Sequence, residues 1–139
     1  MKYLTLLLLT IALFGSNTSV NDAILGIWWT PEKDGKLEMY EKDGLIFGKL
    51  IWAETPGKDT KNPDPEMRSR DLVGTDIIKN FTYNTRKERW EGGTIYDANS
   101  GKTYSCRMWF PDGDTKKLKV RGYIGISLLG RTEVFERVE

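Results

Sequence analysis

Residues 36–54 read KLEMYEKDGLIFGKLIWAE and carry the clearest secondary-structure signal in the chain. Before the Asp43-Gly44 step, apolar and polar side chains alternate, so that Leu37 and Met39 share one face of the segment. Alternation with a period of two is typical of a half-buried strand. An Asp-Gly step between two strand-like runs is the strongest short-range signal of a β-hairpin. The stretch therefore predicts two antiparallel strands joined by a tight turn.

The chain beyond residue 25 continues as short strand-like runs separated by turn residues. The expected strands cover residues 25–30, 36–42, 45–54, 76–83, 88–96, 102–110, 117–124 and 131–138, where 76–83 also fits a short helix. Sequential short strands predict an all-β protein, a single antiparallel up-and-down β-barrel of about eight strands, which closes the sheet and leaves no exposed edge. Gly92-Gly93 predicts a bulge or a tight bend. Residues 55–70, rich in Pro, Lys and Asp, predict a long solvated loop.

The N-terminus differs from the rest, and we assign residues 1–20 to a signal peptide and residues 24–139 to the barrel domain. Lys2 supplies a positive charge, residues 4–14 are apolar apart from threonine, and small and polar residues follow. This order is the pattern of a secretory signal peptide. A membrane-spanning helix needs about 20 apolar residues, so we expect no integral membrane anchor. The predicted location is the periplasm or the extracellular medium.

Composition excludes several classes of function. Lys and Arg number 21 against 20 Asp and Glu, and removing a signal peptide that contains Lys2 leaves 20 of each. A neutral domain has no overall field to attract nucleic acid, so we expect no nucleic-acid partner. The sequence has no histidine and a single cysteine, Cys106, which removes the Ser-His-Asp triad and the usual zinc sites. We therefore expect no cofactor and no metal, and we expect Cys106 to lie in the core.

The Gly26-Ile27-Trp28 step, at the start of the first expected strand, is similar to the Gly-x-Trp start of lipocalins and related calycin barrels. In those barrels the tryptophan closes one end, and an arginine from the last strand packs over it. The resemblance implies that Gly26 and Trp28 close this barrel together with Arg131 or Arg137, and we assign this part to Arg131. An arginine over an indole forms a cation–π contact of ~0.5–2 kcal/mol.

A second and more specific set of motifs follows in fixed order along the chain. These are YEKDG at 40–44, WEGGTIYD at 90–97, GKTY at 101–104, LKVRGYIG at 118–125 and LLGRT at 128–132. Together they resemble the bacterial family of small exported proteins catalogued as domain-of-unknown-function family 2147, over roughly residues 25–137. The resemblance implies a calycin-like barrel in a bacterial periplasm. It implies no activity, because the family is uncharacterised.

The candidates for ligand binding are Trp52, Tyr104, Arg121 and Tyr123. Trp52 and Tyr104 fit an aromatic-lined pocket. Core filling is the favoured interpretation for any single one of the five tryptophans, although Trp52 fits a cavity wall equally well. Arg121 and Tyr123, together with Arg131, form a basic cluster suited to an anionic head group of the kind that a fatty acid carries. These residues predict a site for a small hydrophobic or amphipathic ligand.

Leu128 and Leu129 form an apolar pair in a turn-like stretch between two glycines. Connections between strands are normally solvated. An apolar pair in such a place therefore predicts either a plug for one end of the barrel or a docking loop for a protein partner.

These observations leave three classes of function open. The leading hypothesis is a non-enzymatic periplasmic binding barrel for a small apolar or amphipathic ligand, which requires a cavity of ~300 Å³ or more. The second is a module that binds an envelope protein, of the stress-response or inhibitor type, with a barrel filled by side chains and an apolar patch around Leu128 and Leu129. The third is an enzyme that uses two carboxylates, which would converge in a cleft with perturbed pKa values.

Overall fold

The computed structural model describes residues 20–125 and 130–139. The predicted signal peptide, apart from Val20, and the Leu128-Leu129 pair lie outside the described residues. In the described ranges, no helix has the length and apolar character that crossing a membrane requires.

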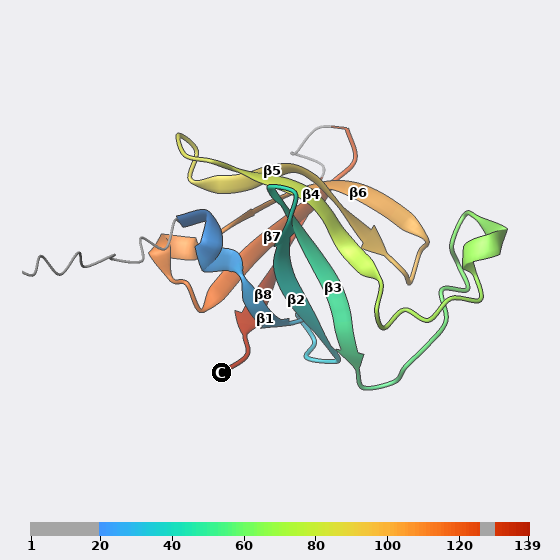
Figure 1. Cartoon of the computed structure of the whole chain (residues 1–139). Helices are drawn as coiled ribbons and strands as arrows, with labels where there is room; N and C mark the ends of the chain where they lie inside the picture. The colour runs from blue at the N-terminus through green and yellow to red at the C-terminus, as the bar shows by residue number, and fades with distance from the viewer. Residues whose placement is uncertain (1–19, 126–129) are drawn as a thin grey trace, which may run out of the picture.

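The described chain forms a closed antiparallel β-barrel, as predicted. Its strands are β1 (Gly26–Trp29), β2 (Gly35–Lys42), β3 (Leu45–Ala53), β4 (Asp76–Asn84), β5 (Arg89–Asp97), β6 (Lys102–Trp109), β7 (Lys117–Tyr123) and β8 (Arg131–Arg137). Each strand pairs with the next one along the chain, and β8 pairs with β1 to close the sheet (Figure 1). Short 3-10 segments accompany them: η1 (Val20–Ile24), η2 (Pro65–Met67) and η3 (Pro111–Gly113). The segment that fitted either a strand or a short helix is the strand β4.

The β2–β3 hairpin turns on Asp43 and Gly44, as predicted. Both residues have positive φ, 52° and 78°, which is the backbone conformation that a two-residue type I′ turn requires. Lys42 pairs with Leu45 across the turn. This register places Leu37 and its alternate neighbours on the buried face of β2.

The paired glycines of β5 form a bulge, which confirms the prediction for Gly92-Gly93. The pairing of β5 with β6 shifts in register between Trp90 and Gly93. Gly93 approaches β4 so closely that a Cβ atom there would collide with the ring of Phe81 and the carbonyl of Lys79. A glycine at this position therefore lets the Phe81 ring pack into the core.

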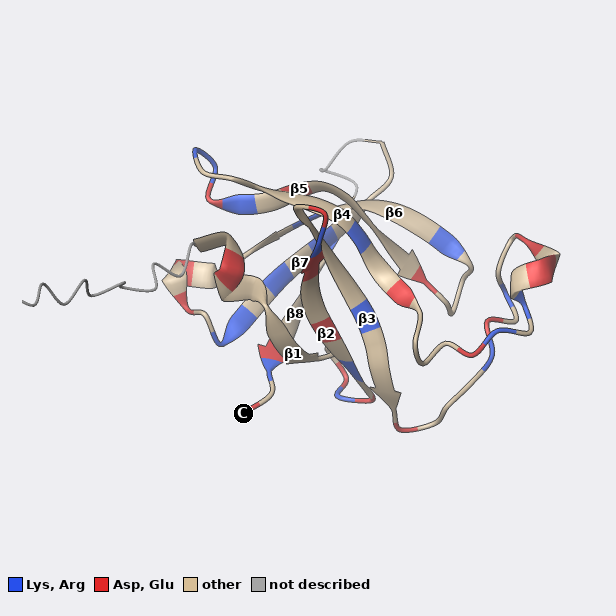
Figure 2. Ribbon diagram, in the orientation of Figure 1, with Lys and Arg blue, Asp and Glu red and all other residues tan. Residues whose placement is uncertain are grey.

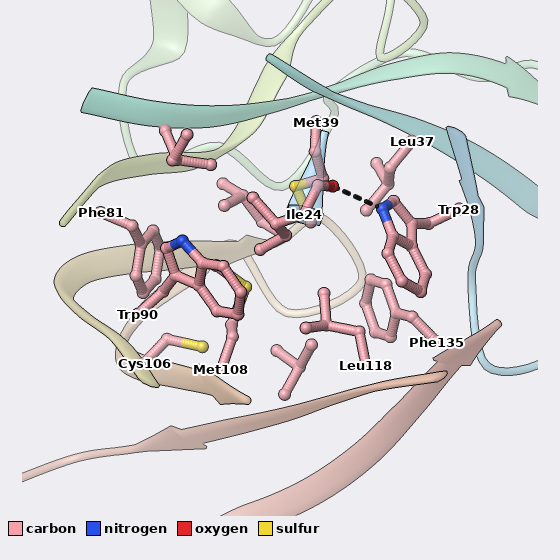
Figure 3. Close-up of a cluster of buried hydrophobic side chains, with 13 residues drawn as sticks. Ile24, Trp28, Leu37, Met39, Phe81, Trp90, Cys106, Met108, Leu118 and Phe135 are labelled. Atoms are coloured by element: carbon pink, nitrogen blue, oxygen red, sulfur yellow. Dashed lines mark hydrogen bonds between the residues drawn. The ribbon is translucent and has the colours of Figure 1, made fainter. Parts of the chain in front are cut away.

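The hydrophobic core lies inside the barrel, between its strands (Figure 3). Trp28, Phe81 and Trp90 are its largest fully buried side chains. The other core residues are Ile24, Leu37, Met39, Ile46, Ile78, Cys106, Met108, Leu118, Val120 and Phe135. Burial raises the pKa of the Cys106 thiol to about 12, so the thiol stays protonated, as suits a core residue.

The 3-10 segment η1 covers the end of the barrel that holds this core. The indole Nε1 of Trp28 donates a hydrogen bond of 2.9 Å to the carbonyl of Ile24, drawn in Figure 3. The indole Nε1 of Trp90 donates a hydrogen bond of 3.0 Å to Oδ1 of Asn21. The two largest core side chains thus hold η1 in place, and the fully buried Ile24 seals the interior.

Arg137, and not Arg131, packs over the Trp28 indole. Its guanidinium carbon lies 4.2 Å from the ring centroid, and it donates hydrogen bonds to the carbonyls of Leu25 (2.9 Å) and Ala23 (2.6 Å). The assignment of this part to Arg131 is wrong because the β1–β8 register places Arg137 directly opposite Trp28. Arg131 lies at the other end of β8.

Candidate functional site

The barrel is hollow at the end opposite η1. A cavity of about 900 Å³ opens there, between the β1–β2 turn, the long loop that joins β3 to β4, the β5–β6 turn and the start of β8. Val120 and Phe135 belong both to its lining and to the core, so they form its floor. The cavity is therefore closed on the inner side and accessible from one end of the barrel.

Apolar side chains from successive strands form most of the cavity wall. They are Leu50 of β3, Ile77 of β4, Ile95 of β5 and Tyr104 of β6, with Val120 and Phe135 at the floor. Ile95 and Tyr104 lie directly opposite each other in the β5–β6 pairing. Such a wall offers an apolar ligand contact from several sides.

A buried carboxylate attaches the long loop to the barrel. Asp59 is fully buried and accepts hydrogen bonds from the Tyr96 hydroxyl (2.5 Å), Asn62 Nδ2 (2.8 Å) and Arg70 Nε (2.9 Å). Burial alone would raise the pKa of Asp59, but these hydrogen bonds together outweigh burial and lower the pKa. The charged carboxylate thus fixes the loop, which contributes Leu72 to the cavity wall.

The loop also packs against the β5–β6 turn. Gly101 has a φ of +72°, and a Cβ atom there would collide with the carbonyl of Lys61. Lys61 Nζ donates a hydrogen bond of 2.8 Å to the carbonyl of Asn99. Part of this loop extends away from the barrel with η2 (Figure 1). These contacts hold the base of the loop beside the cavity. The prediction of a solvated loop therefore holds only for its outer part.

Charged side chains surround the mouth of the cavity. Glu32 and Asp34 lie in the β1–β2 turn, Asp97 ends β5, and Arg131 and Glu133 lie on β8. Figure 2 shows acidic positions in the β1–β2 turn and at the end of β5. Arg131 and Glu133 form an ion pair. Among the described residues, no group of three or more metal-ligating side chains is placed to hold a metal ion.

Two of the predicted ligand-binding residues line the cavity and one lies elsewhere on β7. Tyr104 and Tyr123 both contribute to the lining. Arg121 lies on the outer face, where its Nη1 donates a hydrogen bond of 2.9 Å to the Thr132 hydroxyl. The expectation that Arg121 faces the ligand is wrong, because alternation along β7 turns the adjacent Val120 inward.

Trp52 lies outside the barrel, which corrects the prediction for this residue. The pairing of β3 with β2 shifts by one residue at Ile51, so that Trp52 lies opposite the outward-facing Lys36. A one-residue bulge reverses the face to which later side chains point. Trp52 is 41% exposed. Its ring stands edge-on to that of Trp29, with centroids 6.0 Å apart, and the Lys36 ammonium lies 5.3 Å from the Trp52 ring centroid.

Several residues of the site were not predicted from the sequence. Ile95 and Phe135 line the cavity. Ile95 follows the polar Thr94, and this alternation is a signal that could have identified it, whereas Phe135 follows the apolar Val134 and alternation does not single it out. Glu133 also lines the mouth of the cavity. No local pattern indicates Asp59, because its partner Tyr96 lies 37 residues away along the chain.

A family model matches almost the whole described chain. The model is described as "Uncharacterized protein conserved in bacteria (DUF2147)" and matches residues 26–137. The chain belongs to this family. The match begins with the first residue of β1 and ends with the last residue of β8, so the DUF2147 region and the barrel coincide. This confirms the resemblance that the sequence motifs indicated.

A solved structure with a similar fold is described as "Protein HP1028 from the human pathogen Helicobacter pylori belongs to the lipocalin family". It shares 24% sequence identity with this DUF2147 chain, and the two superpose with a TM-score of 0.73 over 84% of this chain and 83% of that one. The likeness shows the fold, which is a lipocalin-like barrel. No curated protein matches the sequence.

Proposed function

We propose that this DUF2147 protein is an exported, non-enzymatic binding barrel that holds one small apolar or amphipathic molecule in its cavity. The observation that carries the proposal is the cavity of about 900 Å³, floored by the core and accessible at one end. Sites for small ligands measure ~300–1,000 Å³. A barrel of eight strands is just wide enough either to be filled by side chains or to hold one small ligand, and the cavity favours the second arrangement.

The apolar wall supports binding by the hydrophobic effect. Leu50, Ile77, Ile95 and Phe135 present their side chains to the cavity. Removing apolar surface from water contributes ~25 cal/mol per Å², so a ligand that buries roughly 400 Å² gains ~10 kcal/mol. Association costs at least ~4 kcal/mol. The remaining ~6 kcal/mol corresponds to a dissociation constant of roughly 40 µM before any polar contact is added.

Two further observations support parts of the proposal. Export rests on the signal-peptide pattern of residues 1–20, and the bacterial family agrees with a periplasmic or secreted location. The competing hypothesis, a module that binds an envelope protein, requires a barrel filled by side chains. A cavity larger than the ~300 Å³ that a ligand needs favours the binding barrel over that module.

Titration with an apolar fluorophore tests the proposal. We expect N-phenyl-naphthylamine to bind the mature protein one-to-one with increased emission, because the cavity removes the dye from water. Ile95→Trp adds bulk to the wall and should weaken binding at least ~10-fold, or ~1.4 kcal/mol. The melting temperature should stay within about 3 °C of the wild type, because the added bulk enters empty space.

Val134→Trp is the matched control for this titration. Val134 is 39% exposed on β8 and lies opposite Lys119 on the outer face, so the substitution adds similar bulk away from the cavity. This variant should bind the dye as the wild type does. Unsaturable binding to the wild type, or an equal loss in both variants, would contradict the proposal.

A further inference from the structure

We infer that the cavity selects ligands with a positively charged head group, such as a long-chain amine or a quaternary ammonium compound. This inference rests on the proposed function and adds the class of ligand. Among the described residues, the lining of the cavity includes the acids Glu32, Asp34, Asp97 and Glu133, whereas its basic side chain is Arg131. The apolar wall and this excess of negative charge together define the ligand.

Neutral groups are the hydrogen-bond partners of two of these acids. Asp34 accepts a hydrogen bond of 2.8 Å from the Thr30 hydroxyl. Asp97 accepts hydrogen bonds from the Ser100 hydroxyl (2.7 Å) and the Asn99 backbone amide (3.0 Å). Such partners orient a carboxylate without adding a positive charge, so both acids still attract a cation at the mouth.

Arg131, the arginine at the mouth, is already paired with an acidic side chain. Arg131 forms its ion pair with Glu133, whose side chain is 35% exposed while that of Arg131 is 85% exposed. Glu133 lies opposite the inward-facing Val120, so its carboxylate is the more sheltered partner and faces the cavity. Lys61, beside the mouth, donates to the carbonyl of Asn99. Lys33 of the β1–β2 turn is paired with Glu136, and Lys102 lies opposite Asp97 in the β5–β6 pairing. The four acids of the lining outnumber Arg131, Lys61 and Lys102 by one, so the charge around the opening stays negative.

A charged head group at the mouth lies close to acidic side chains of the β1–β2 turn, β5 and β8. A cation gains from Glu133 and Asp97, whereas an anion is repelled by them, and selectivity commonly uses attraction and repulsion together. This reverses the expectation that Arg121, Tyr123 and Arg131 bind an anionic head group. Arg121 lies on the outer face and Arg131 is occupied by Glu133.

Competition between three dodecyl compounds and the bound fluorophore tests the inference in the mature protein. Dodecyltrimethylammonium, dodecanol and dodecanoate share one chain and differ in head-group charge, and all are used below micelle-forming concentrations. We expect the cation to bind roughly tenfold more tightly than dodecanoate at about 20 mM salt. The ratio should shrink to about twofold at about 500 mM salt, because salt screens the charges at the mouth.

Replacing an acidic and a basic residue of the mouth in turn shows whether these side chains cause the preference for cations. Glu133→Gln should lower the cation-to-anion ratio about threefold, and Arg131→Gln should raise it by a similar factor. Glu38→Gln is the matched control, because Glu38 is exposed on β2 opposite Lys49 and its loss changes the net charge equally. This control should leave the ratio unchanged, and melting temperatures establish that each variant folds.

The outcomes separate the inference from the proposed function. A cation preference that falls in Glu133→Gln and persists in Glu38→Gln supports the inference. Equal affinity for the three compounds, tighter binding of dodecanoate, or failure of all three to displace a bound fluorophore overturns it and leaves the binding barrel standing. Failure of the fluorophore itself to bind overturns the proposed function and the inference with it.

Discussion

At the scale of the residue, Asp59 joins parts of the molecule that are distant in the sequence. Its buried carboxylate receives hydrogen bonds from Tyr96 at the end of β5 and from Asn62 and Arg70 in the long loop. A charge is stable in the interior only when it is paired and hydrogen-bonded, and here the barrel and the loop both supply donors. Because the loop also contributes Leu72 to the cavity wall, Asp59 positions part of the site.

The lowered pKa of Asp59 predicts a loss of stability in acid. The ordinary aspartate value is 3.8, and the value in the folded protein lies below it. A group whose pKa is lower in the folded state stabilises the fold above its unfolded pKa, and this contribution disappears as the pH falls through the folded pKa. We expect the melting temperature to drop as the pH falls below 3.8, and Asp59→Asn to make that drop smaller. Thermal melts of both proteins across this range measure the difference.

Asp59→Asn should also release the long loop at neutral pH. Arg70 loses its charged acceptor, and we expect a cost of ~1–3 kcal/mol in the free energy of unfolding and faster trypsin cleavage of the loop. Glu91→Gln is the control, because the pKa of Glu91 is also lowered by hydrogen bonds, from Asn84 and Arg89. Those partners belong to the β4–β5 hairpin, so cleavage of the loop should not change. Equal cleavage rates in the two variants would contradict this role of Asp59.

At the scale of the element, bulges decide which side chains face the interior. The β5 bulge brings Gly93 against β4, and Gly93→Ala would drive a Cβ atom into Phe81 and the carbonyl of Lys79. We expect it to destabilise the fold by ~1–3 kcal/mol or more. Gly57→Ala should cost less than ~0.5 kcal/mol, since a Cβ atom there meets nothing within 4 Å. Urea unfolding measures both, and a Gly93→Ala variant as stable as Gly57→Ala would refute the close approach.

Local signals predicted the strands, but not every register. The Asp-Gly turn and the alternation before it are local, and they suffice for the β2–β3 hairpin. Counting every second residue from Ile46 and Leu50 predicts that Trp52 points inward. Residues 45–53 are apolar on both faces except at Lys49, so nothing marks the bulge that turns Trp52 outward. The partner of Trp28 depends on the register of β8 against β1, and that register selects Arg137 over Arg131.

At the scale of the whole molecule, the barrel is closed at one end and hollow at the other. Trp28 and Trp90 fill the closed half beneath η1, whereas the aromatic lining of the cavity includes Tyr104, Tyr123 and Phe135. Whether a barrel of this size is filled depends on how side chains from several strands meet. Strand patterns could therefore predict the barrel, while the cavity and its acidic mouth needed the three-dimensional arrangement.

A nuclear magnetic resonance titration of the isotopically labelled protein with N-phenyl-naphthylamine tests most directly whether the cavity is the ligand site. We predict saturable one-to-one shift changes at amides around the cavity, including Ile95, Tyr104 and Glu133, and none at Asn21 in η1 at the closed end. Shift changes gathered on the outer face around Trp52, or no shift changes at a saturating concentration of the dye, would contradict a binding barrel.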